Sequence, residues 1–406
     1  MVMFRKYSPF GFAQFGYSIF SNTIPIFVVL VLGMGAFEIG LLNTIVSVFS
    51  MAGILFWGRM IDRTALRKLF SVLGFVGASA GVVLAIFSTS YQIVMGSCIL
   101  LGLFFSVFGV LGSTIVCQER NGKYWQRLKA YNTVIYTGAL FGLCFAVIVL
   151  TFTSGEFGLR FLLLFAFASF VFGLLFSSYI LPIRGEHMPR LSKSELIKIN
   201  TSIIERLHYL PSKLRHSLGL GGLNPRIYGI CIGLGLMVFA FSGFYTTLPI
   251  LLIGKDVGGN GIFLVHLIGV SACTVAFLTA RKNPPVKTLQ RFVGLRVAII
   301  LFFVALIPLN SPFLVLLLAV CFNGILGWTW ARISSSSVEM VVKYTNDYNA
   351  GRAMGAYHLG ISIGTAAGAI TGGLLYINWG ATSYFLLGLF AIAGLGIAIM
   401  SHEGRG

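Results

Sequence analysis

Long apolar segments follow one another along almost the whole chain, and short polar connections separate them. A helix of about 20 predominantly apolar residues crosses the hydrocarbon core of a bilayer, and each of these segments is long enough to do so. The pattern therefore predicts an integral membrane protein with twelve spans: 9–32, 37–57, 69–87, 92–117, 128–151, 157–181, 227–253, 261–280, 292–309, 312–338, 353–377 and 381–400.

Connections rich in Lys and Arg alternate along the chain with connections that have almost none. The odd-numbered connections hold only Arg160 and Lys255, whereas the N-terminus, the even-numbered connections and the C-terminus hold nearly all the other lysines and arginines. Arg296 and Arg332 are placed close to the matching ends of their spans. Because an excess of Lys and Arg marks cytoplasmic loops, we expect a plasma-membrane protein with both termini in the cytoplasm.

Composition excludes a soluble protein. The 406 residues are 57% hydrophobic and only 10% charged, with a mean hydropathy of +0.91. A net charge of +18 would suggest nucleic acid in a soluble protein, but short loops hold these basic residues, so we expect contact with anionic lipids instead. The six cysteines occur singly, which predicts neither a disulfide framework nor a metal site, and no cofactor is expected.

One long polar stretch, 182–225, divides the chain. Residues 192–195 have the form of a capping box, and Leu196, Ile199, Ile203 and Leu207 follow at helical spacing. This predicts a basic amphipathic helix on the membrane surface, with a disordered linker as the alternative. The expected organisation is an N-terminal six-helix bundle (1–181), a linker (182–225) and a C-terminal six-helix bundle (226–406).

The two halves also resemble each other. Residues 17–26 align with 241–250 at an offset of 224 and keep Ser, Phe, Thr, Pro and Ile in register. Residues 130–142 align with 356–368 at an offset of 226 and keep an Ala-Tyr pair and two glycines. Two matches at nearly the same offset predict duplication of a six-span unit.

A short, highly charged connection lies between the second and third spans. It resembles the G-x-x-x-D-R-x-G-R-R/K signature of the major facilitator superfamily of transporters, although Ala65 and Leu66 depart from that pattern. Control of topology by positive charge is the alternative explanation. With the duplication, the resemblance covers nearly the whole chain and implies an all-α membrane fold of two pseudo-symmetric six-helix bundles. The matching residues are Gly58, Asp62, Arg63 and Arg67.

The resemblance also implies a gating role for charges at the cytoplasmic face. Asp62 would meet the positive N-terminal end of the eleventh span, and Arg63 and Arg67 would pair with acids such as Glu119. Solvated loop charges are the alternative, since exposed pairs contribute little. The remaining candidates for this network are Arg127, Glu339 and Arg352.

In this family the substrate site lies between the halves near mid-membrane. Polar residues within spans face protein or a water-filled cavity, so they are the candidates for substrate contact, with interhelical hydrogen bonding as the alternative. The candidates are Gln14, Ser18, Asn22, Asn43, Tyr131, Asn132, Tyr136, Ser242, Tyr245, Thr246, Asn323 and Trp330.

None of the eleven acidic residues falls within a predicted span centre. A buried carboxylate is a common proton-coupling group, so this pattern favours a facilitator or a weakly coupled carrier. His266 and His358 are the remaining titratable candidates for coupling, with neutral packing histidines as the alternative.

We therefore expect a transporter that moves a small organic solute by alternating access, acting as a monomer. A drug or amphipath efflux carrier with His-linked proton coupling is the main alternative. A membrane enzyme is disfavoured because the sequence has no paired carboxylates or metal-binding motif. A solute receptor is disfavoured because the C-terminus ends soon after the last span.

Overall fold

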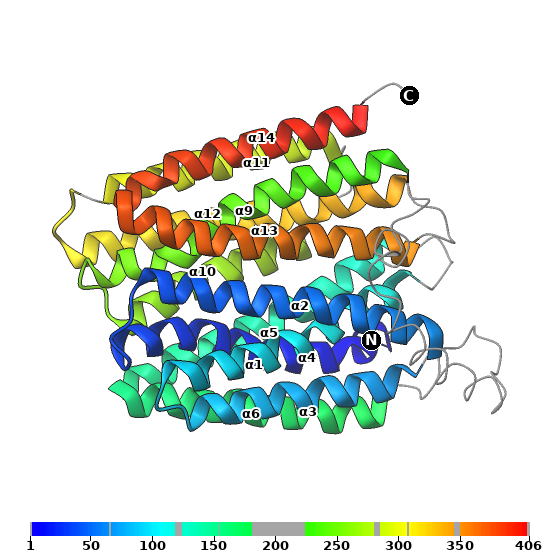
Figure 1. Cartoon of the computed structure of the whole chain (residues 1–406), viewed down its shortest axis with the longest axis horizontal. Coiled ribbons are helices and arrows are strands. Elements are labelled where there is room, and N and C mark those ends of the chain that lie inside the picture. The colour runs from blue at the N-terminus through cyan, green and yellow to red at the C-terminus, as the bar shows by residue number, and fades with distance from the viewer. Residues whose placement is uncertain are drawn as a thin grey trace.

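The computed structural model describes residues 2–64, 66–117, 124–153, 155–180, 224–279, 285–306, 308–344 and 350–403 (Figure 1). Within these ranges the chain is helical apart from short turns. The α-helices are α1 (Val2–Leu30), α2 (Ala36–Thr64), α3 (Arg67–Ile86), α4 (Tyr91–Cys117), α5 (Tyr124–Phe152), α6 (Gly155–Ile180), α9 (Pro225–Ile253), α10 (Gly259–Leu278), α11 (Pro285–Phe302), α12 (Pro312–Lys343), α13 (Ala350–Trp379) and α14 (Ser383–Glu403). Two 3₁₀ helices, η1 (Phe303–Leu306) and η2 (Gly380–Thr382), complete the set in these ranges.

Every predicted span overlaps one of these helices, and the predicted all-helical membrane fold is confirmed. By length and hydropathy, ten segments of the described chain qualify as membrane spans. The number is ten because α13 and α14 together form one qualifying segment, and because α11 holds Lys287, Arg291 and Arg296 within its 18 residues. The amphipathic helix predicted within 182–225 lies almost wholly outside the described residues.

Local signals in the sequence set the starts of two helices. Asn224 precedes α9 and its side chain accepts a hydrogen bond from the Arg226 backbone N–H at 3.0 Å. Ser311 precedes α12 and accepts from the Leu314 N–H at 3.4 Å. A proline follows each cap, where its missing N–H costs nothing.

The two halves repeat one packing pattern. In the first half α1 packs against α5 and α6, α4 packs against α2 and α3, and α3 packs against α6. The second half has the equivalent contacts: α9 packs against α13 and α14, α12 packs against α10 and α11, and α11 packs against α14. Between the halves, α2 packs against α13 and α5 packs against α10 (Figure 1). The arrangement is two pseudo-symmetric six-helix bundles side by side.

The same glycine contacts recur in both bundles. A Cβ added to Gly138 would lie closer than 3.0 Å to the Gly11 carbonyl oxygen, and one added to Gly364 would do the same at Gly235. Gly235 and Gly364 follow their first-half counterparts at the offsets of 224 and 226 seen in the sequence. Glycine at these positions therefore allows α5 to approach α1, and α13 to approach α9, at backbone contact.

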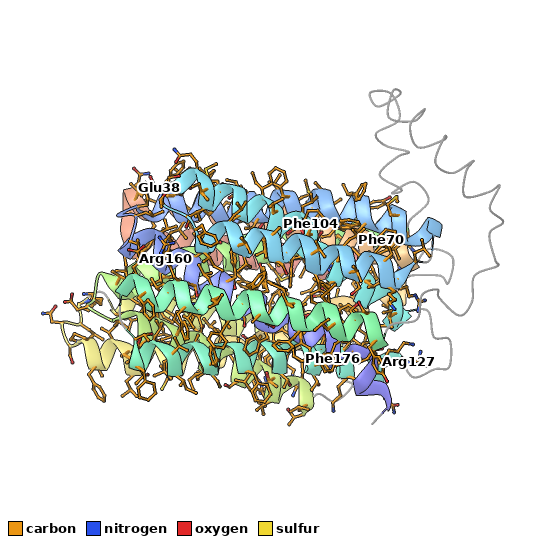
Figure 2. The ribbon with its side chains drawn as sticks, turned by 90° about the horizontal axis from the view of Figure 1, so that it is seen from below. Glu38, Phe70, Phe104, Arg127, Arg160 and Phe176 are labelled. Atoms are coloured by element: carbon orange, nitrogen blue, oxygen red, sulfur yellow. The ribbon has the colours of Figure 1, made fainter. Side chains whose placement is uncertain are left out.

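Helix α1 begins and α14 ends at the same end of the bundle, here called the terminal end; the opposite end is the far end (Figure 1). Figure 2 places Glu38 and Arg160 at the far end and Arg127 at the terminal end. The two basic residues predicted for the far end bind main-chain oxygens. Arg160 donates to the Ile86 and Ser88 carbonyls, and Lys255 donates to the Leu309 carbonyl at 3.0 Å. Both therefore have a structural role there.

Candidate functional site

A cavity of about 220 Å³ lies between the two bundles. Five helices contribute to its wall: α1, α2, α9, α10 and α13. Ten of its fourteen lining residues have polar side chains, four are Pro, Val or Ile, and none is Lys, Arg, Asp or Glu. The lining residues are Tyr17, Ser21, Asn22, Pro25, Asn43, Val46, Ser47, Ser242, Tyr245, Thr246, Pro249, Ile262, His266 and Thr365.

Two prolines in the cavity wall occupy equivalent positions in the two halves. Pro25 lies inside α1 and Pro249 lies inside α9, 224 residues later. A proline within a helix has no N–H to donate to the carbonyl four residues earlier. The carbonyls so released belong to Ser21 and Tyr245, which both line the cavity. Each half therefore has, in a residue that lines the cavity, a backbone carbonyl that lacks its usual helical donor.

Polar side chains join the two halves at the cavity. Asn43 Nδ2 donates to Thr246 Oγ1 at 3.3 Å, which links α2 to α9. Ser242 Oγ donates to the Thr365 carbonyl at 2.9 Å and holds α9 to α13 within the second half. These groups are hydrogen-bonded in the structure, yet their hydroxyl and amide atoms can exchange partners with a bound solute.

Close contacts between the halves lie beside the cavity, at Thr44, and on its far side. Thr44 Oγ1 donates to the Ala366 carbonyl at 2.8 Å, and Asn260 Nδ2 donates to the Leu150 carbonyl at 2.9 Å. A Cβ added to Gly40 would lie 2.8 Å from the Ala369 carbonyl oxygen, so α2 and α13 touch through their backbones. The far side is tightly closed at these positions.

An aromatic contact joins the halves on the terminal side. Trp330 Nε1 in α12 donates to the Tyr136 hydroxyl in α5 at 2.9 Å, and the Tyr136 ring stacks on Phe277 in α10 at 4.9 Å. Cys273 is only 2% exposed and belongs to this same small apolar cluster. The cavity thus lies between two sets of contacts that hold the bundles together.

Arg296 lies one side chain behind the cavity wall. The sequence interpretation placed it near the end of its span, and this was wrong: the residue is about 16 Å along a helix of about 27 Å and only 2% exposed. The predicted span began at 292, whereas α11 begins at Pro285, so eleven residues of the helix precede Arg296 and six follow it. Its guanidinium donates to the Leu326 carbonyl, to Thr329 Oγ1 at 3.2 Å and to the Tyr245 hydroxyl at 3.4 Å.

The structure brings six of the predicted site residues together at the cavity. They are Asn22, Asn43, Ser242, Tyr245, Thr246 and His266. Asn323 lies immediately behind them, because it accepts from the Tyr245 hydroxyl at 3.1 Å and donates to the Val265 carbonyl at 2.7 Å. Tyr136 and Trp330 form the contact on the terminal side.

The other predicted residues do not line the cavity. Ser18 is buried between α1 and α5 and bonds the Phe15 and Ala139 carbonyls. Tyr131 packs on Tyr7 and Phe10 and donates to the Phe108 carbonyl at 3.4 Å. The ring of His358 packs edge-on against Tyr357 in α13. Gln14 and Asn132 are half-buried.

The predicted gating charges are described only in part. Gly58 and Arg67 are half-buried near the terminal end, Arg127 is 6% exposed there, and Glu339 is half-buried near the end of α12. The side chains of Asp62, Arg63, Glu119 and Arg352 lie outside the described residues. Their gating role stays a prediction.

Sequence reasoning missed several residues of the cavity. Tyr17, Ser21 and Thr365 line it but had not been selected as candidates. The match of 17–26 with 241–250 contained Tyr17, Ser21 and Pro25, so the duplication itself was a usable signal. Among the described residues no group of three or more His, Cys, Asp or Glu side chains is arranged to hold a metal ion.

Comparison with known proteins identifies the family. The sequence matches the Major Facilitator Superfamily over residues 10–339. A search of curated protein sequences found no match to the chain. The crystal structure of the human organic anion transporter MFSD10 (TETRAN) is similar, with a TM-score of 0.68 and 16% identity, covering 97% of this chain and 99% of that chain.

Two further solved structures have TM-scores of 0.71 and 14% identity. One concerns substrate recognition in proton-dependent oligopeptide transporters and covers 99% of this chain and 98% of that chain. The other is a bacterial homologue of the human drug peptide transporters PepT1 and PepT2, and the match covers 98% of this chain and 97% of that chain. At these identities the likeness shows the fold alone.

The repeated bundles and the cavity between them define a multi-pass membrane protein of the carrier class. The chain belongs to the Major Facilitator Superfamily, and it is a secondary transporter for a small molecule rather than an enzyme.

Proposed function

We propose that this protein moves a small organic solute by alternating access and that the solute occupies the central cavity. The observation that carries the proposal is the cavity of about 220 Å³, to which both bundles contribute polar groups. Pockets for drug-sized ligands are about 300–1,000 Å³, so this cavity favours a smaller solute over a bulky amphipath. Asn22, Asn43 and Thr246 are the proposed hydrogen-bonding contacts.

A second cavity supports an entry route from the far end. It has a volume of about 480 Å³ and is lined by the α5–α6 turn, the α9–α10 turn and the start of α12. It includes Ile26 and Gly261, whereas the adjacent Pro25 and Ile262 line the central cavity. Only one layer of α1 and α10 therefore separates the two cavities, and a small displacement of these helices would join them.

We further propose the topology predicted from charge, with the terminal end in the cytoplasm of a plasma membrane and anionic lipid headgroups against its basic loops. The domain boundaries proposed are 1–181, 182–225 and 226–406, in a monomer. The recurrence of the α1–α5 glycine contacts in α9–α13 supports a boundary between two equivalent units.

Uptake into proteoliposomes containing the purified protein tests the proposal. Sugars, organic anions, amino acids, short peptides and cationic dyes would be screened with and without a pH gradient. We expect saturable uptake of at least one small solute, reduced by Asn43→Leu and by Thr246→Val. Thr151→Val, an exposed change of the same kind on α5, is the matched control and should leave uptake unchanged. Absence of uptake for every class would contradict the proposal.

Proton-coupled efflux is the second candidate, and the position of His266 favours it. His266 lines the cavity with its ring 6.4 Å from the Tyr245 ring, whereas His358 packs away from the cavity. If His266 exchanges protons during the cycle, His266→Gln should leave solute binding intact and abolish the pH dependence of transport. His358→Gln is the control. An unchanged pH profile in His266→Gln would rule out this coupling role.

A further inference from the structure

Arg296 is a buried positive charge without a counter-charge. No carboxylate of the described residues lies within salt-bridge distance of it, and its Nε is buried with no hydrogen-bond partner. Its neighbours are neutral: one carbonyl, two hydroxyls and the rings of Phe241, Tyr245 and Trp330 at 4.4–5.6 Å. Burying an unpaired charge is costly, so the arginine is a poor choice for stability alone.

Tyr245 connects this charge to the cavity. Tyr245 lines the cavity, and its hydroxyl accepts from Arg296 Nη2 and donates to Asn323 Oδ1. The lining contains no Asp or Glu that would neutralise the charge, and no Lys or Arg. In a site of low dielectric the field of an unscreened guanidinium extends well beyond its contacts. The cavity is therefore favourable to an anion and unfavourable to a cation.

The ring faces around the guanidinium reinforce this. Phe241 and Trp330 take the cation against their electron-rich faces, which stabilises the charge without cancelling it. The carboxylate of a ligand in the cavity would supply the negative charge that balances the Arg296 guanidinium. One arginine balances one negative charge, so the expected ligand is monovalent.

We propose that the cavity takes a small monovalent organic anion, and that Arg296, acting through Tyr245, makes it selective for that charge. This inference rests on the proposed transport function and names its substrate class. Arg296 is a selectivity residue that acts through its field and through the orientation of Tyr245, and the substrate itself contacts Tyr245.

Binding measurements on the purified full-length protein in nanodiscs test the charge preference. The probes are sets that share a skeleton and differ in charge at pH 7.5: benzoate, benzamide and benzylamine, and lactate with lactamide. Calorimetry should show at least one anion binding about tenfold or more tightly than its amide, and no measurable binding of benzylamine. Equal binding within every set, or no binding of any anion, would overturn the proposal.

Variants assign the preference to Arg296. Arg296→Gln should remove the anion preference, so that an anion and its amide bind with equal affinity, whereas Arg296→Lys should keep most of the preference. Arg291→Gln, an exposed arginine on the same helix, is the matched control and should behave as wild type. An anion preference that survives in Arg296→Gln would overturn the assignment. If the wild-type protein took up none of the solutes, that result would instead contradict the proposed function.

Thermal unfolding separates selectivity from a structural role. Gln can still donate to the Leu326 carbonyl, and it removes an unpaired buried charge, so Arg296→Gln should have a Tm equal to or above that of the wild type. A Tm lowered by more than about 5 °C, with an unchanged anion preference in Arg296→Gln, would assign the arginine to structure alone.

Discussion

At the scale of single residues, burial and neighbours decide which polar side chains contribute to the cavity. Asn22 and Ser18 lie one turn apart on α1, yet Asn22 lines the cavity and Ser18 is buried against α5. A polar stripe on a helix indicates that these positions face other helices. It does not distinguish a solvent-filled space from a packed interface, because both offer hydrogen-bond partners.

Arg296 shows a second limit of sequence reading. Basic residues shortened the apolar segment of α11, and the predicted span began seven residues too late. Its charge was then assigned to the end of the span. Only the neighbouring helices, which bury Arg296 among aromatic rings, reveal the error.

Gly364 provides a residue-scale prediction. Gly364→Ala places a methyl group against the Gly235 carbonyl, so α13 must move away from α9, at a cost of about 1–3 kcal/mol. The free energy of unfolding, measured by reversible denaturation in mixed micelles, should fall accordingly. Gly355→Ala on the same helix has no atom within 4 Å of the new Cβ and should stay within about 0.5 kcal/mol of wild type. Equal effects at both sites would contradict the contact.

At the scale of elements, the helices and their order were predictable and their contacts were not. Hydropathy identifies segments long enough to span, and the repeat shows that two units share one fold. The contacts between α5, α10 and α12 depend on individual rings, such as Tyr136 on Phe277, and no period in the sequence encodes them. Tyr136 and Trp330 were selected as substrate contacts, which stays a prediction, and the structure shows that they also contact each other.

Tyr136→Phe tests this element contact. It leaves the buried Trp330 N–H without its partner whenever the halves meet on the terminal side, which costs about 1–3 kcal/mol. The fraction of molecules in which the two halves are separated on the terminal side should rise about fivefold or more over that of the wild type. Alkylation of Cys273 by a maleimide, in a background without the other cysteines, should accelerate by the same factor. Tyr179→Phe, on the exposed face of α6, should leave the alkylation rate unchanged.

At the scale of the whole molecule, transport requires the two bundles to move relative to each other. The contacts between α2 and α13 hold them together at the far side, while each bundle has its own internal contacts. The family and the fold follow from the sequence because duplication and hydropathy involve the whole chain. The closed arrangement on both sides of the cavity follows only from the tertiary contacts.

Cross-linking tests the motion. A disulfide between Thr44→Cys and Ala366→Cys, formed by a mild oxidant in a cysteine-free background, should abolish solute uptake because it joins the two bundles. Reduction with dithiothreitol should restore uptake. The control joins Ser71→Cys to Ser177→Cys, whose hydroxyls lie 2.7 Å apart on α3 and α6 of one bundle. Uptake that continues with the first pair fully oxidised would show that this contact does not open.

The glycine contacts between α1 and α5, and between α9 and α13, also determine how large a movement has to be. Backbone contact at these glycines keeps the two helices of each pair close together, so we expect each bundle to tilt as one body. A 29-residue helix such as α1 is about 44 Å long, and a tilt of about 20° around its middle moves each end by about 7 Å. That displacement admits a small solute at one end, and the same tilt brings the opposite end together.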